Sequence, residues 1–278
     1  MKYLEGCPVA KKILDGVSKQ AKQMHARGVT PTIAVVLVGE NPSSELYVQK
    51  KKEVARKVGI DFLLYKIPST IKQKDLEELL TTLYLDETVH GVVLQLPLPE
   101  HLDLSKVIKF IAPEKDIDHF HENSPYSPPT ASAVIELLKF YEVELKNKKV
   151  AVLGNGFLVG KPLSKILKGS GAQVNVYTEK NKDIAKETAK ADVLISATGQ
   201  PHLIKKEFTN TKQIIVDVGS ARDKKTNVLV GDVDRQSVGE NIEAITPMVG
   251  GVGPITIALL LKNVILAAKK NELISFTL

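Results

Sequence analysis

The chain has 278 residues, of which 43% are hydrophobic and 25% charged, and its formal net charge is +6. A soluble chain of this length can bury a sizeable core in one large domain or two ordinary ones. The single cysteine, Cys7, excludes an internal disulfide and a multi-cysteine metal site. No apolar run reaches the roughly 18 residues that a membrane span requires, and the charged, amphipathic N-terminus does not resemble a signal peptide. We therefore expect a cytoplasmic protein with no membrane partner.

The positive charge does not indicate a nucleic-acid partner. Lysines are spread along the chain among acidic residues, and no basic strip with interleaved aromatic residues is present in the sequence. A mildly basic surface would instead raise the local concentration of a polyanionic small molecule. A small-molecule substrate is therefore the expected partner.

The first part of the chain has the pattern of a parallel α/β sheet. Strand-like runs at residues 33–38, 62–67 and 91–95 alternate with helical stretches near residues 43–58 and 71–84. Alternation of this kind predicts parallel strands joined by helices.

Tyr47 and Lys51 lie four residues apart in the first predicted helix. Residues at this spacing share one helix face, so the tyrosine ring should lie beside the lysine amine. An aromatic platform next to a lysine suits a flat substrate. The alternative is a half-buried tyrosine and a solvated lysine, because charge runs usually face water.

Gln95 ends the apolar run at residues 91–95 and is followed by Pro97 and Pro99. A polar residue at the carboxyl end of a buried strand lies where open α/β sheets bind ligands. The two prolines should end the strand, since neither can donate to a sheet ladder. A core glutamine is the alternative interpretation.

A second α/β unit begins after a proline-rich passage and a predicted helix near residues 131–141. The strand at residues 149–153 leads into Gly154-Asn155-Gly156, and Gly160 then opens a helix. Glycines in this context permit a tight turn and let the backbone approach a dinucleotide pyrophosphate at the helix N-terminus. An ordinary turn is the alternative, because a glycine loop alone is weak evidence.

The next strand, at residues 173–177, is followed by Thr178 and Glu179. An acidic residue there would accept a hydrogen bond from the ribose 2′-hydroxyl of NAD and repel the 2′-phosphate of NADP. Lys180 and Lys182 lie close enough in sequence to bind that phosphate. The residues alone leave the choice of dinucleotide open.

The C-terminal part holds a glycine-rich segment at residues 250–254 and an apolar stretch of helical spacing at residues 255–270. The glycines would let backbone amides face a ligand, or form a flexible hinge. Asp217, Asp232 and Asp234 have no further ligand at a suitable spacing, so we interpret them as structural and expect no metal.

Five ordered motifs make the chain resemble the methylenetetrahydrofolate dehydrogenase/cyclohydrolase (FolD) family, the bifunctional enzymes of folate one-carbon metabolism. The likeness covers essentially the whole chain. The motifs are Ser44 to Lys51, Leu94 to Pro99, Pro113 to Asp118, Gly231 to Asp234, and Thr246-Pro247 with Gly250 to Pro254.

The resemblance implies a two-domain α/β fold with a cleft between an N-terminal substrate domain and a Rossmann-like dinucleotide-binding domain. Residues 1–120 would form the folate domain, completed by residues 255–278, and residues 121–254 would bind NAD(P). The resemblance also implies a homodimer, and it favours NADP slightly over NAD.

The implied function is oxidation of 5,10-methylenetetrahydrofolate to the 5,10-methenyl form, then hydrolysis to 10-formyltetrahydrofolate, a donor for purine biosynthesis. Lys51 would be the base for hydrolysis, oriented by Gln95. Tyr47 would stack on the aminobenzoate ring, and Asp118 would bind the pterin. The dinucleotide would contact Gly154, Asn155, Gly156, Val159, Gly160, Thr178, Glu179 and Ser220. The folate would contact Ser44, Tyr47, Gln95, Pro97, Asp118, Gly250, Gly251, Pro254 and Thr256.

The chain departs from the family at Asn155 and Gly156, where NADP-using members often carry arginine and serine, and at His119, where the family has glycine. Three alternative functions remain open. A two-domain dehydrogenase for a hydroxy acid or a shikimate-like substrate would explain the glycine loop but not Tyr47, Lys51 and Gln95 together. A monofunctional cyclohydrolase and a non-catalytic folate- or nucleotide-binding relative are the others.

Overall fold

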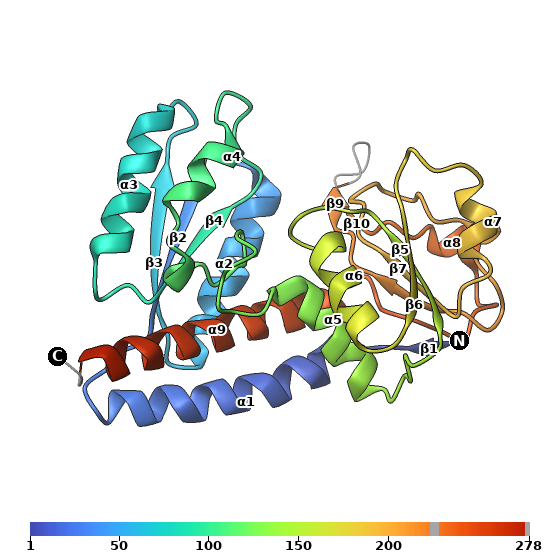
Figure 1. Cartoon of the computed structure of the whole chain (residues 1–278), viewed down its shortest axis with the longest axis horizontal. Coiled ribbons are helices and arrows are strands. Elements are labelled where there is room, and N and C mark those ends of the chain that lie inside the picture. The colour runs from blue at the N-terminus through green and yellow to red at the C-terminus, as the bar shows by residue number, and fades with distance from the viewer. Residues whose placement is uncertain (223–227, 276–278) are drawn as a thin grey trace. The chain divides into compact units, whose positions relative to one another are not determined.

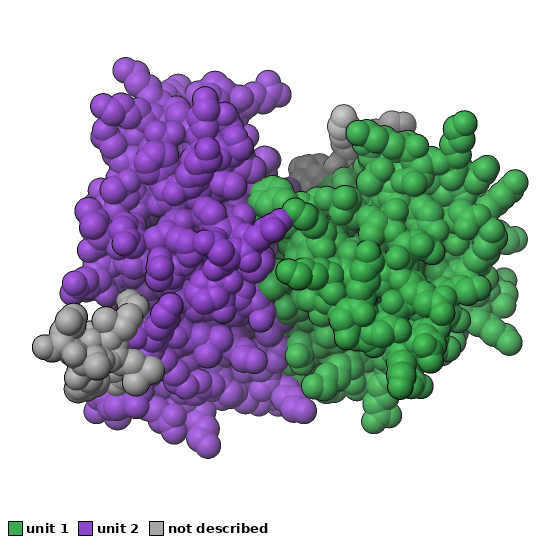
Figure 2. Space-filling view, viewed as in Figure 1, with its two compact units in different colours: residues 1–10, 128–256 green, residues 11–127, 257–278 purple. Residues whose placement is uncertain are grey.

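The computed structural model describes residues 1–222 and 228–275, which form two compact units (Figures 1 and 2). Unit 1 comprises residues 1–10 and 128–256, and unit 2 comprises residues 11–127 and the chain from residue 257 onward. Each unit has a parallel sheet with helices, which confirms the predicted two-domain α/β class. Residues 276–278 of the expected C-terminal segment lie outside the described residues.

The sheet of unit 2 has three parallel strands in the order β3-β2-β4. Every residue of the central strand β2 (Thr32–Val38) is buried, as expected where neighbouring strands and packed elements enclose a β-branched run. The apolar runs predicted as strands are strands. The other elements of this unit are β3 (Asp61–Ile67), β4 (Gly91–Gln95), α2 (Pro42–Lys57), α3 (Gln73–Leu85), α4 (Leu104–Val107) and the 3-10 helices Ile108–Phe110 and Pro113–Lys115.

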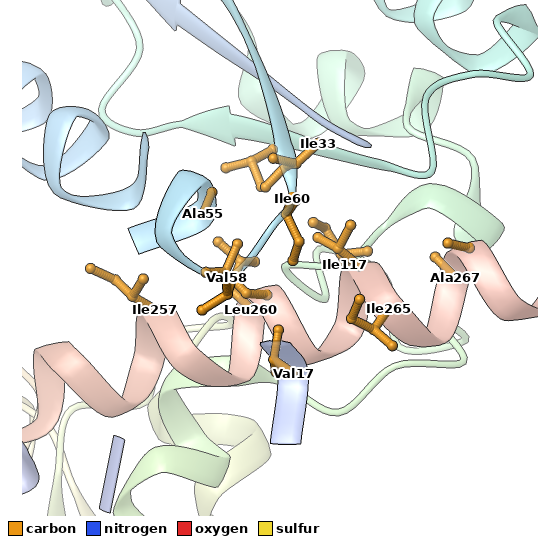
Figure 3. Packing of buried hydrophobic residues seen from close by; sticks show 14 of the residues in the cluster. Val17, Ile33, Ala55, Val58, Ile60, Ile117, Ile257, Leu260, Ile265 and Ala267 are labelled. Carbon is orange, nitrogen blue, oxygen red and sulfur yellow. The ribbon is translucent and has the colours of Figure 1, made fainter. Parts of the chain in front are cut away.

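The core of unit 2 is completed by a segment far away in the sequence. Helix α9 (Val252–Ser275) contributes Leu260 and Ile265 to the buried hydrophobic cluster that also contains Ile33 of β2 (Figure 3). Helix α1 (Gly6–His25) adds Val17 to the same cluster. Burial of apolar side chains from both ends of the chain therefore stabilises this unit.

Helix α9 is long and apolar enough, by length and composition alone, to cross a membrane between Val252 and Lys270. The apolar runs of the sequence predicted no such segment. In the structure 72% of this stretch is buried inside the protein. Its apolar character is therefore accounted for by its place in the core, since a helix that is hydrophobic all round is typical of a protein interior.

Asn263 is the polar exception among the buried residues of α9. It is 4% exposed, and its Nδ2 donates to the carbonyl oxygens of Ile117 and Ser127, each at 2.9 Å. A buried amide is stable only when it is hydrogen-bonded, and here the two bonds hold the ends of the loop at residues 117–127 on the helix.

Asn263→Ala is expected to lower the free energy of unfolding by about 2–3 kcal/mol, because two buried carbonyl oxygens lose their donor and a small cavity opens. Urea unfolding followed by circular dichroism measures this loss. Lys262→Ala, at the exposed neighbouring position, is the control and should have an effect within about 0.5 kcal/mol. Equal losses in the two variants would contradict the structural role of Asn263.

The sheet of unit 1 has six parallel strands in the order β1-β11-β8-β7-β5-β6. Its hydrophobic cluster joins Leu153, Leu194 and Ile215 from three neighbouring strands. The predicted strands 149–153 and 173–177 and the helix near 131–141 are confirmed. The elements are β5 (Lys149–Leu153), β6 (Gln173–Tyr177), β7 (Val193–Ser196), β8 (Ile214–Asp217), β11 (Ala244–Ile245), α5 (Pro129–Phe140), α6 (Gly160–Gly169), α7 (Ile184–Thr188), α8 (Arg235–Val238), the 3-10 helix Lys206–Phe208 and the antiparallel pair β9 (Ala221–Arg222) and β10 (Leu229–Val230).

The first ten residues differ from the expected first domain of residues 1–120. Strand β1 (Lys2–Tyr3) pairs with β11 at the edge of the six-stranded sheet, so Met1–Ala10 belong to unit 1. The hydroxyl of Tyr141 also accepts from the backbone N–H of Glu5 and donates to its carbonyl oxygen. A strand of two residues is too short to show a hydrophobic period, which is why the sequence did not predict it.

Candidate active site

Helix α2 places Tyr47 beside Lys51. The helix begins after Asn41, whose side-chain oxygen accepts from the N–H groups of Ser43 and Ser44, with Pro42 in the first turn. The Lys51 amine lies 4.8 Å from the centre of the Tyr47 ring, and Lys51 is only 4% exposed. The predicted pairing of the two side chains is thus present, and Lys51 is not one of the solvated lysines of its run.

Gln95, at the end of β4, holds the lysine amine. Lys51 Nζ donates to Gln95 Oε1 at 3.0 Å, and Gln95 Nε2 donates to the carbonyl oxygen of Leu96 at 2.9 Å. The same carbonyl oxygen accepts from the hydroxyl of buried Ser44 at 3.1 Å. The peptide between Leu96 and Pro97 is cis, and Pro97 is exposed. Three predicted residues, Ser44, Lys51 and Gln95, are therefore joined in one hydrogen-bonded network through the carbonyl oxygen of Leu96.

Asp118 supplies the charge opposite Lys51. Burial lowers the pKa of Lys51, and the carboxylate of Asp118 opposes this shift. Burial likewise raises the pKa of Asp118, against the effect of the Lys51 charge. Burial, with a smaller contribution from Asp118, raises the pKa of Tyr47. Tyrosine thus stays a neutral ring, while the lysine amine is easier to deprotonate than in water.

The loop after Asp118 is organised by Asp116, which is fully buried. Its carboxylate accepts from the N–H groups of Phe120 and His121 and lies 3.1 Å from the His121 ring nitrogen. His119 adopts a left-handed φ of 62°, where a glycine meets no steric penalty, and its ring Nδ1 lies 2.8 Å from the carbonyl oxygen of Tyr126. Both histidines thus contact the loop itself.

In unit 1, the loop Gly154–Gly160 has the close packing that a dinucleotide cradle needs. Gly154 has a φ of 95°, and a Cβ there would lie 2.5 Å from the carbonyl oxygen of Ala197. A Cβ on Gly160 would collide with the carbonyl oxygen of Gly154, whereas Gly156 faces open space. The N-cap residue of α6, Val159, makes no side-chain capping bond. The start of α6 therefore fits a pyrophosphate, which would be held by backbone N–H groups.

The loop after β6 carries the residues predicted to contact the ribose. The backbone N–H of Thr178 donates to Asn181 Oδ1 at 2.8 Å, which closes the turn. Glu179, Lys180 and Lys182 are all exposed on this turn. Asn155, Gly156 and Ser220 are exposed as well, each after a strand of the same sheet. Carboxyl ends of parallel strands are where such sheets bind nucleotides.

Four predicted substrate residues, Gly250, Gly251, Pro254 and Thr256, belong to unit 1. Only Thr256 departs from the expected division, which gave residues 255–278 to the folate domain. Gly250 has a φ of 84° and accepts from the N–H of Gly6, while a Cβ on Gly251 would lie 2.5 Å from the carbonyl oxygen of Pro247. Thr256 turns its hydroxyl to the backbone of α9, and Pro254 lies in the first turn of that helix. Gly250, Gly251 and Thr256 therefore pack against neighbouring segments of unit 1.

Asp217 and Asp232 make the structural contacts expected of them. The Asp217 carboxylate accepts from the N–H groups of Asp232 and Val233 at 3.1 and 3.2 Å. Asp234 accepts from the N–H of Ser237 and caps α8. Across residues 1–222 and 228–275, no group of three or more histidine, cysteine or acidic residues is placed to hold a metal.

Burial, together with the charge of Asp232, raises the pKa of Asp217 from 3.8 to about 6. The native protein then binds the proton of the Asp217 carboxyl group more tightly than the unfolded chain does. The contribution of this group to the free energy of unfolding is therefore complete below pH 3.8 and is lost as the pH rises through about 6. The loss amounts to about 3 kcal/mol. Urea unfolding of the wild type and Asp217→Asn at pH 4 and pH 7 should show a difference that changes by about this amount. The exposed Asp183→Asn is the control, and an unchanged difference for Asp217→Asn would contradict the shift.

Known proteins match this chain in both units. Residues 4–118 match the catalytic domain of the tetrahydrofolate dehydrogenase/cyclohydrolase family, and residues 128–272 match its NAD(P)-binding domain. The chain belongs to the tetrahydrofolate dehydrogenase/cyclohydrolase family. The bifunctional protein FolD of Aquifex aeolicus is 40% identical over 287 residues, covering 99% of this chain and 98% of that protein.

Solved structures of the family have the same fold as this chain. The bifunctional FolD enzyme of Campylobacter jejuni is 36% identical with a TM-score of 0.91, covering 97% of this chain and 99% of that one. FolD of Trypanosoma brucei, solved with NADP and an inhibitor, is 33% identical with a TM-score of 0.89, covering 96% and 97%. The resemblance inferred from the five motifs is thereby confirmed.

Two residues that organise the site received no role from the sequence. Asn263 and Asp116 hold the loop that carries Asp118, by the hydrogen bonds described above. Asn263 gave one signal, since it is a lone polar residue among the apolar residues of α9. Asp116 gave none beyond its place in a family motif, because carboxylates that accept backbone N–H bonds have no periodic pattern.

Proposed function

We propose that this protein oxidises 5,10-methylenetetrahydrofolate to the 5,10-methenyl form with a nicotinamide dinucleotide and hydrolyses the product to 10-formyltetrahydrofolate. The observation that carries the proposal is the buried Lys51 amine, which lies 3.0 Å from Gln95 and beside the Tyr47 ring in a chain of this family. Among residues 1–222 and 228–275, no feature favours a binding protein or a monofunctional cyclohydrolase.

In the oxidation, the task of the chain is to orient the substrate. The dinucleotide, when bound, supplies the acceptor for the hydride. Tyr47 offers a neutral ring face on which the aminobenzoate can stack, and Asp118 offers a carboxylate that accepts from the pterin's amide and amino groups. Orientation of this kind is worth about 7–11 kcal/mol in the best intramolecular reactions. No side chain needs to move a proton in this step.

In the hydrolysis, water adds to the methenyl carbon and loses a proton, and the bond between that carbon and N5 then breaks as N5 gains a proton. Lys51 is the base in this proposal, since burial lowers the pKa of its amine toward the working range. A cationic methenyl substrate beside the amine would lower that pKa further. Gln95 Oε1 accepts from the amine and so fixes its direction.

We propose NADP as the dinucleotide, ahead of NAD. Lys180 and Lys182 are exposed on the turn after β6 and can approach a 2′-phosphate, while Glu179 on the same turn opposes it. Two positive charges against one negative charge support the phosphate-bearing dinucleotide. Glu179→Gln should then increase the preference for NADP, while the rate of oxidation with NAD should fall or stay unchanged.

We also propose that the protein is a cytoplasmic homodimer, as the family resemblance implies. Sedimentation equilibrium of the purified protein tests the dimer, for which a mass near twice 30.4 kDa is expected. A mass near that of one chain across micromolar concentrations would reject it.

The decisive assay follows methenyl formation by absorbance from 5,10-methylenetetrahydrofolate, with NADP and NAD in parallel, and then the decay of added methenyl substrate without dinucleotide. Both reactions are expected, the first faster with NADP. Decay of the methenyl substrate without oxidation of the methylene substrate would indicate a monofunctional cyclohydrolase. If neither reaction occurs, the folate assignment is rejected.

A further inference from the structure

The carboxylate of Asp232 lies behind the carboxyl edge of the six-stranded sheet in unit 1. Asp232 is 1% exposed and comes from the segment between β10 and α8. One of its oxygens, Oδ2, accepts from Ser196 Oγ at 2.7 Å and from both the backbone N–H and the hydroxyl of Thr198 at 2.8 Å. A buried charge from a distant segment thus holds the loop that follows β7.

This loop lies directly against the glycine cradle. The carbonyl oxygen of Ala197 fills the space where a Cβ of Gly154 would be, at 2.5 Å. Thr198 Oγ1 donates to Asp232 and accepts from the N–H of Gln200 at 3.2 Å, so the carboxylate sets the path of the loop on both sides of Thr198. The position of Ala197 beside Gly154 therefore depends on Asp232.

The second oxygen of Asp232 touches a second loop of the same edge. A Cβ on Gly219 would collide with Asp232 Oδ1, so Gly219 packs directly against this oxygen, and Ser220 follows it. Oδ1 has no hydrogen-bond partner among the residues that the structure describes. Burying a carboxylate with one hydrogen-bonded oxygen and one unpaired oxygen lowers the stability of the fold. Packing alone would not require a carboxylate at this position.

We propose that Asp232 is a positioning residue for the dinucleotide, which fixes the loops at residues 197–200 and 218–220 around the glycine cradle before the dinucleotide binds. The inference rests on the proposed function. It assigns a role in dinucleotide binding to a residue that would not itself touch the dinucleotide. Pre-formed loops lower the entropic cost of binding, because less backbone must be ordered in the complex.

The test compares Asp232→Ala with Asp232→Asn in the full-length protein. Asparagine keeps an oxygen that can accept from Thr198, whereas alanine removes it. Asp232→Ala is expected to raise the dissociation constant for NADPH, measured by calorimetry, at least about tenfold, and Asp232→Asn at most about threefold. In the protein without dinucleotide, amide hydrogen exchange at Thr198 should speed up in Asp232→Ala alone. Ser196→Ala is the matched control and should change NADPH binding less than about twofold, since it leaves both Thr198 bonds in place.

Cyclohydrolase activity without dinucleotide separates this inference from the proposed function. It should stay within about twofold of the wild type in every variant, because its predicted catalytic residues Lys51, Gln95 and Asp118 lie in unit 2. Wild-type protein that lacks this activity, or that binds neither NADPH nor NADH, would reject the proposed function itself. Normal NADPH binding in Asp232→Ala with fast exchange at Thr198 would overturn the positioning role, as would equal weakening in Asp232→Asn and Asp232→Ala.

Should Asp232→Ala fail to fold, Thr198→Val decides the question. Valine keeps the shape of threonine but loses the two bonds of the hydroxyl, to Asp232 and from the N–H of Gln200, while the backbone N–H of residue 198 still donates to Asp232. Several-fold weaker NADPH binding and faster exchange at Gln200 would support the positioning role. Wild-type binding in this variant would reject it.

Discussion

Lys51→Met is expected to abolish cyclohydrolase activity, with a fall in kcat of about 100-fold to 10,000-fold, the range typical of a lost general base. Methionine has nearly the length of the lysine side chain and can pack beside the Tyr47 ring. It removes the amine that donates to Gln95 and leaves no group able to take a proton from water. The decay of methenyltetrahydrofolate, corrected for its rate in buffer, measures this effect.

The oxidation should survive this substitution better than the hydrolysis, because it needs no proton transfer from the chain. We expect methenyl formation with NADP to persist at a rate set by how well the folate is still held. Lys50→Met is the control, since Lys50 is exposed one residue earlier in the same helix, and both of its rates should match the wild type. A Lys51→Met enzyme that retains most of its hydrolysis would assign the proton transfer to another group.

Gly160→Ala is expected to remove most dinucleotide-dependent oxidation. The added Cβ collides with the carbonyl oxygen of Gly154, which is backbone and cannot turn aside as a flexible side chain would. Either the start of α6 or the strand end at Gly154 must then move, and the backbone N–H groups lose their positions around the pyrophosphate. We expect at least about a tenfold rise in the dissociation constant for NADPH, which corresponds to about 1.4 kcal/mol.

Gly169→Ala is the matched control for this substitution. Gly169 ends the same helix, and a Cβ there meets nothing within 4 Å. It should leave NADPH binding unchanged and raise stability by about 0.5–1 kcal/mol, because alanine is the better helix former. Cyclohydrolase activity should be retained in both variants. Loss of hydrolysis in Gly160→Ala would mean that the collision unfolds more of the protein than the glycine cradle.

The sequence predicted those parts of the fold that have a local pattern. The strands at 33–38, 91–95 and 149–153 are buried runs, and Tyr47 and Lys51 meet because a helix brings residues four apart onto one face. The bond between Lys51 and Gln95 was implied by the resemblance to the family, and it is present in the structure. The expected division into two domains came from the resemblance of the five motifs to the family.

The parts that the sequence did not predict depend on partners far apart in the chain. The β1–β11 pairing joins two strands of two residues each, and Asn263 meets carbonyl groups more than one hundred residues away. Asp232 was correctly assigned a structural place, but its bonds to Thr198 join loops that have no common pattern. Residues of this kind are recognised only when the backbone of both partners is known.

The interleaved order of the two units along the chain has a consequence for synthesis on the ribosome. Unit 2 is built from residues 11–127 and from the chain after residue 256, so the helix that fills its core emerges last. Unit 1 needs β11, which precedes that helix only slightly, to complete its sheet and seat β1. Domains usually fold in turn as they leave the ribosome, N-terminal first. Here the strands of unit 2 are made early, but its core waits for α9, and the sheet of unit 1 waits for β11, so neither unit can close until the segment after residue 243 has left the ribosome.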